Sequence, residues 1–189
     1  GRMRYEREEA LRLLDVEWDD SRAFGCDYFR ANYTDKDWTP QLLISICDST
    51  RPDIQKFGRE MMTTFFTTEH GEEYLLKLTQ HPSADLQLFA TNYLTEFASG
   101  KLEHLNTLEP YFITVLSAVN KSRVAKDRIL TFLHKEAMDN PNAARLTNRI
   151  LDRISVTIAI GDKAKCIDIL RDIQLKYPHI QTPVKVVEV

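Results

Sequence analysis

The sequence predicts an all-α protein: a right-handed α-α superhelix of about five antiparallel helix pairs. Three observations predict this fold. Apolar residues recur at spacings of three and four, which is typical of amphipathic helices. One helical pattern returns along the chain at steps of 32 to 40 residues. Proline and capping residues separate the periodic segments. We therefore expect one solenoid domain over residues 1–178 and a short extended tail over residues 179–189, where a β-prone run follows Pro178.

The recurring pattern is an aromatic residue, a small residue, and two large apolar residues three and four positions after the small one. It aligns without gaps in 22–29, 55–62 and 87–94, and weaker copies lie around Ile129 and Ile169. Glycine weakens a helix, so the small residues Gly25, Gly58 and Ala90 predict that a neighbouring helix packs closely there. In the fourth copy this position is Lys126, so that copy diverges. The aromatic residues of these segments are expected in the core: Phe24, Phe57, Phe65, Phe89, Tyr93 and Phe97.

A second set of helical patterns precedes these segments and supplies the other helix of each pair. These patterns cover residues 40–47, 72–78, 105–119 and 142–158, while residues 8–14 and 21–32 would form the first pair. Thr39 and Asn140 each precede a proline, which predicts N-caps. Ser83 is expected to cap the helix after Pro82, and Gly161-Asp162 to end one helix and cap the next.

The opening of the second helices, Asp-x-x-x-Phe-Gly as in 53–58, resembles HEAT and armadillo repeats over residues 8–176. An irregular helical bundle is the alternative fold. The resemblance implies that the second helix of each pair lines a concave surface, so that its outward positions contact a partner. These positions define the expected protein-binding ridge: Arg22, Gln55, Arg59, Gln87, Asn92, Arg123 and Lys126.

Charge is distributed unevenly along the chain. Residues 1–119 hold 12 Lys and Arg against 20 Asp and Glu, a net of −8, whereas residues 120–176 hold 12 against 7, a net of +5. Three arginines at steps of four share one helix face. Such a surface can bind phosphates of nucleic acid, bind an acidic protein, or be a solvated mixed-charge surface. The expected basic patch, beyond the ridge residues, is Lys121, Arg128, Arg145, Arg149, Arg153, Lys163 and Lys165.

The sequence contains no pattern typical of catalysis, of a metal site or of a cofactor site. The cysteines, Cys26, Cys47 and Cys166, are three in number and lack CxxC spacing, so we interpret them as small buried residues of a cytoplasmic protein. The five histidines are scattered and match no ligand spacing. No apolar run is long enough to cross a membrane.

These observations favour a non-catalytic scaffold that binds an unidentified protein partner, and they leave open that the chain is part of a larger protein. The alternative is nucleic-acid binding by the basic C-terminal half. The HEAT resemblance also implies a variant of this alternative, because some HEAT-like bacterial proteins are DNA glycosylases that hold the duplex in a basic, aromatic-lined concave face. The acidic first 119 residues depart from that pattern.

Overall fold

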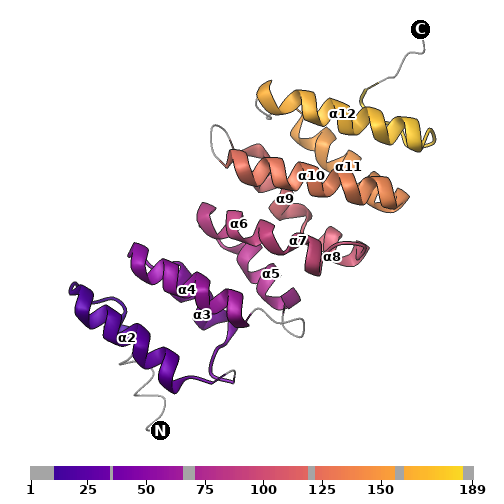
Figure 1. Cartoon of the computed structure of the whole chain (residues 1–189). Helices are drawn as coiled ribbons and strands as arrows, with labels where there is room; N and C mark the ends of the chain where they lie inside the picture. Colours follow the sequence, from indigo (N-terminus) through magenta and orange to yellow (C-terminus); the bar gives the residue numbers. More distant parts are fainter. Residues whose placement is uncertain (1–10, 35, 66–70, 119–121, 156–159, 185–189) are drawn as a thin grey trace. The chain divides into compact units, whose positions relative to one another are not determined.

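The computed structural model describes residues 11–34, 36–65, 71–118, 122–155 and 160–184 (Figure 1). All regular structure in these ranges is helical, which confirms the all-α prediction. No helix in the described part is long and apolar enough to span a bilayer. The elements are α2 (Asp19–Asn32), α3 (Pro40–Cys47), α4 (Pro52–Phe65), α5 (Gly71–Gln80), α6 (Ala84–Ala90), η1 (Thr91–Tyr93), α7 (Leu94–Phe97), α8 (Leu102–Thr107), α9 (Glu109–Ser117), α10 (Arg123–Asp139), α11 (Pro141–Ile154) and α12 (Ile160–Lys176).

The chain divides into two compact units, Gly1–Lys77 and Leu78–Val189. In the first unit α4 packs against both α2 and α3. An aromatic cluster lies among these helices: the ring of Trp38 is 5.8 Å from that of Phe29 and 6.3 Å from that of Phe57. The single domain over residues 1–178 stays a prediction.

In the second unit α10 contacts α6 and η1 as well as α12, while α11 contacts α8, α9 and α12. Helices α10 and α12 run parallel: the start of one contacts the start of the other, and the end of one contacts the end of the other. Near the starts Lys126 contacts Asp162, and near the ends the Tyr177 hydroxyl donates to the Met138 carbonyl at 3.0 Å. The two helices are seen side by side in Figure 1.

The close packing predicted at the two glycines is confirmed. A Cβ at Gly58 would lie 2.7 Å from the backbone nitrogen of Cys47, and a Cβ at Gly25 would lie 3.2 Å from the Cβ of Leu13. The partner residues are again 33 apart, since Gly25 faces 13–14 and Gly58 faces 46–47. The two segments that align without gaps in the sequence therefore also make equivalent contacts in the structure.

Most of the predicted boundaries are confirmed. The Thr39 hydroxyl accepts a hydrogen bond from the Leu42 amide at 3.3 Å, and the Asn140 side chain accepts one from the Asn142 amide at 2.8 Å. Ser83 precedes α6, although its side chain makes no capping bond. Residues 179–184 contain no regular structure and lie on the preceding helices through the buried Ile180. The rest of the β-prone run lies outside the described residues.

Three predictions about helix limits are wrong. Residues 105–119 are not one helix, because α8 ends before Leu108 and α9 begins just ahead of Pro110, where a proline favours a new helix start. The 3₁₀ turn η1 interrupts the third of the aligned helices, and Phe89 and Tyr93, which were expected in the core, are only half-buried. Helix α12 already begins at Ile160, so Gly161-Asp162 does not separate two helices.

The prediction that Phe24 belongs to the core is also wrong. Its side chain is 64% exposed, although the aligned Phe57 is 2% exposed. The buried residues of α2 are Arg22, Gly25, Cys26 and Phe29. Phe24 therefore lies on the outer side of α2, where no described helix covers it.

The glycine contacts yield a stability prediction with a matched control. We expect Gly58→Ala to destabilise the protein by about 1–3 kcal/mol, because the added methyl group meets backbone that cannot rotate away. Gly25→Ala should change stability by less than about 1 kcal/mol in either direction, because relief of the helical glycine offsets a milder contact with leucine side chains. Chemical denaturation measures both, and equal effects of the two variants would contradict the interpretation.

Candidate interaction surface

One polar position recurs in three successive second helices and has the same partner each time. Its side chain donates to a backbone carbonyl six residues earlier, in the loop that precedes the helix. The three bonds are Arg22 Nη1 to Val16 O at 2.9 Å, Gln55 Nε2 to Ser49 O at 2.7 Å, and Gln87 Nε2 to His81 O at 3.0 Å. These donors were predicted for the binding ridge, but they hold the loops ahead of their own helices.

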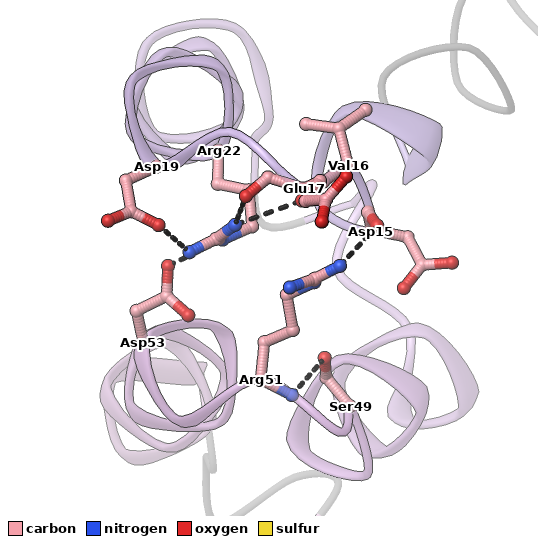
Figure 2. A network of polar contacts seen from close by, with 8 residues as sticks. All are labelled: Asp15, Val16, Glu17, Asp19, Arg22, Ser49, Arg51 and Asp53. Atoms are coloured by element: carbon pink, nitrogen blue, oxygen red, sulfur yellow. Dashed lines mark hydrogen bonds and ion pairs between the residues drawn. The ribbon is translucent and has the colours of Figure 1, made fainter.

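Arg22 is the most constrained of the three (Figure 2). Its side chain points between the two acidic residues Asp19 and Asp53, and its Nε lies 2.7 Å from Asp53 Oδ2. A further bond joins Nη1 to the Glu17 carbonyl at 2.8 Å. The hydrogen bond from Arg22 holds the pKa of Asp53 below its ordinary value, while the same bond raises the pKa of Arg22. Because Arg22 is 6% exposed, the prediction that it faces outward is wrong.

Lys126 is likewise not an outward ridge residue. It is 2% exposed, and its Nζ lies 3.4 Å from Asp162 Oδ2 on α12. A buried ammonium needs such a partner, because removing it from water is costly. The remaining predicted ridge residues differ in exposure: Gln55, Arg59 and Gln87 are half-buried, while Asn92 and Arg123 are exposed. Of the expected ridge residues, only Asn92 and Arg123 are therefore exposed.

The predicted basic patch is largely occupied by contacts between helices. Arg149 binds Glu109 through two hydrogen bonds of 3.0 and 2.5 Å, and this carboxylate raises the pKa of Arg149. Arg128 donates to Asn92 at 2.7 Å, and Lys165 binds Asp127 at 2.5 Å. Lys121 lies outside the described residues. Arg153 and Lys163 are exposed and make no ion pair with a described residue, and Arg145 donates only to Asn142.

A buried carboxylate that sequence reasoning did not single out joins α10 to the start of the loop before α8. Glu136 is buried and accepts hydrogen bonds from the Ser99 hydroxyl at 2.5 Å and the Gly100 amide at 2.7 Å. In the sequence it resembles an ordinary surface glutamate that neutralises nearby lysines. Only its place on the buried side of α10, between Leu133 and Ala137, distinguishes it.

The cysteines are free and buried, as predicted. Burial raises the pKa of Cys47 to about 12 and that of Cys166 to about 11, so their thiols stay protonated near neutral pH. His70 lies outside the described residues. Within them, no group of three or more His, Cys, Asp or Glu side chains could hold a metal ion. A cavity of about 150 Å³ lies beside Leu11, Leu14, Ile46 and Ile54, which is smaller than the roughly 300 Å³ typical of small-molecule sites.

Comparison with protein-family models, with curated proteins and with solved structures gives no match. The HEAT likeness therefore depends on the sequence pattern alone.

The Arg22–Asp53 contact predicts a particular dependence of stability on pH. The folded-state pKa of Asp53 lies below its ordinary 3.8, so its stabilising effect is present above that value and is lost as the pH falls below it. We expect Asp53→Asn to lower the free energy of unfolding at neutral pH, with a deficit that shrinks in acid.

Asp20→Asn is the matched control, because Asp20 occupies the aligned position on α2 and makes no ion pair with a described residue. Its effect should be small at every pH. Denaturant titrations across the acidic range measure both variants, and a deficit for Asp53→Asn that grows in acid would contradict the assignment.

Proposed function

We propose that this chain is a non-catalytic, HEAT-like α-solenoid scaffold that binds a protein partner through the outward side of its second helices. The observation that carries the proposal is the set of equivalent contacts one repeat apart: the loop bonds of residues 22, 55 and 87, and the packing of Gly25 and Gly58. Repeated units of this kind present long exposed surfaces for other proteins. Free cysteines favour the cytoplasm as its location.

We assign the binding part of the proposed ridge to α10. On α10 a row of exposed residues continues the predicted position of Arg123 at helical spacing. Val124 in this row is 54% exposed, and no described helix covers it. The row is Arg123, Val124, Thr131 and Lys135, which we call the α10 row. Its two cations and one apolar side chain fit a partner segment that combines acidic and apolar residues.

We expect Arg123→Glu with Lys135→Glu to abolish partner capture, because both changes place like charges before an acidic segment. The pair Arg145→Glu with Arg153→Glu is the control, since it changes the net charge equally but lies on α11. Pull-downs from lysate, with bound proteins identified by mass spectrometry, compare the two variants with the wild type. An unaltered profile for the α10-row variant, with its thermal midpoint unchanged, would count against the proposal.

Nucleic-acid binding is the second candidate, and the exposed arginines of α11 favour it. Arg145 and Arg153 lie two helical turns apart and have no carboxylate partner among the described residues. Phosphates could therefore approach them without displacing an ion pair. The glycosylase-like variant is less favoured, because Trp38 is buried in the aromatic cluster and only Trp18 is exposed.

A gel shift with duplex DNA and with RNA tests this candidate. If α11 binds phosphates, the wild type retards nucleic acid at low salt and releases it as salt rises. Arg145→Glu with Arg153→Glu should then lose the shift, while the α10-row variant keeps it. No shift at low salt would exclude nucleic-acid binding by this surface.

A further inference from the structure

Helix α2 contacts helix α4 at three residues of α4, which we call the α4 socket: Asp53, Phe57 and Glu60. Two arginines eight residues apart on α2 bind it. Arg22 Nε lies 2.7 Å from Asp53, and Arg30 Nη2 lies 3.4 Å from Glu60. The Arg30 guanidinium also lies over the Phe57 ring, 4.9 Å from its centroid. The two carboxylates and the phenylalanine ring of the α4 socket therefore bind two cations that lie two turns apart on a parallel helix.

Helix α2 carries the same three residues 33 positions earlier, Asp20, Phe24 and Asp27, which we call the α2 socket. The equivalence rests on contacts as well as on the sequence, since Gly25 and Gly58 pack on residues that are also 33 apart. Nothing in the described structure fills this socket. Phe24 is 64% exposed, Asp20 has no ion pair there, and Asp27 binds only Arg30 of its own helix, at 3.1 Å.

The exposed side of α12 carries a complementary row at steps of four, which we call the α12 row: Lys163, Ile167, Arg171 and Leu175. Its two cations lie eight residues apart, as Arg22 and Arg30 do. Ile167, between them, is 49% exposed. Helix α12 binds α10 through its other side, with Asp162 and Asp172. No other described helix therefore covers the row, and the Arg171 pairs to Asp168 and Asp172 are exposed contacts of low energy.

We propose that copies of this chain associate head to tail, with the α12 row of one copy seated in the α2 socket of the next. Lys163 pairs with Asp20, Arg171 with Asp27, and Ile167 covers Phe24, as α2 covers Phe57 within one copy. The net charges of −8 over residues 1–119 and +5 over residues 120–176 favour this encounter. Because the two surfaces differ, each added copy offers a new socket, and the assembly grows beyond a dimer.

The contact does not involve the α10 row, so its test is independent of the proposed function. Light scattering after size exclusion, over a range of protein concentrations at low salt, should show a mean mass that rises past two copies. The mass should fall as salt rises, because the paired charges are exposed to solvent. A chain that stays monomeric at low salt and high concentration would overturn the proposal.

Charge reversal gives the sharper test. Asp20→Lys with Asp27→Lys, and separately Lys163→Glu with Arg171→Glu, should each weaken association about tenfold or more, because like charges then face each other. Mixing the two variants in equal amounts should restore assembly, since each socket then meets a row of opposite charge. Circular dichroism checks that both variants are folded.

Arg145→Glu with Arg153→Glu, two exposed residues outside the socket and the row, reverses as many cations of the basic half as Lys163→Glu with Arg171→Glu does, and should leave association unchanged. If the mixed variants stay monomeric while each is folded, the α2 socket does not bind the α12 row. If the control pair weakens association as strongly, general charge rather than this contact drives it, and the proposal fails.

Discussion

The loop bonds at residues 22, 55 and 87 are the constraint on which the rest of the arrangement depends. A chain that turns between two packed helices exposes carbonyl groups that the helices themselves cannot satisfy. Here the first turn of the following helix supplies the donor, always six residues after the acceptor. The bond fixes where the second helix begins relative to its loop. Once that start is fixed, Gly58 is brought against the backbone of α3 and no larger residue fits.

Charged side chains then set which helices can be neighbours. Lys126 and Glu136 are buried on α10, and among the described residues each is satisfied by a helix or loop 36 residues away in the chain. A shifted register would leave a charge buried without a partner, which costs far more than an exposed pair contributes. The same logic explains why the basic patch became smaller in the structure. Arg128, Arg149 and Lys165 hold neighbouring helices together, so they are less available to a ligand than their sequence spacing indicates.

Features that depend on local chemistry could be predicted from the sequence, and those that depend on a neighbour could not. The all-α class, the caps at Thr39 and Asn140 and the close approach at the glycines follow from spacing, capping and the absence of a side chain. The turn η1 and the break at Leu108 interrupt segments whose apolar spacing is continuous, so periodicity alone does not reveal them. The HEAT resemblance implies that Lys126 and Arg22 face outward, whereas their burial depends on Asp162 and Asp53, which are distant in sequence.

The exposure of Phe24 and of Phe57 also depends on a neighbouring helix. They occupy aligned positions in helices with aligned contacts, and yet one is exposed and the other is covered. The difference is the presence of a preceding parallel helix with two arginines beside Phe57. Each socket helix is held in place by its loop bond and by its glycine contact. The two carboxylates and the ring of a socket therefore have the same positions on their helix whether or not another helix binds them. The chemistry that Asp53 and Phe57 use to bind α2 is therefore separable from the contacts that fold α4, and α2 keeps the same chemistry at a position that no described helix covers.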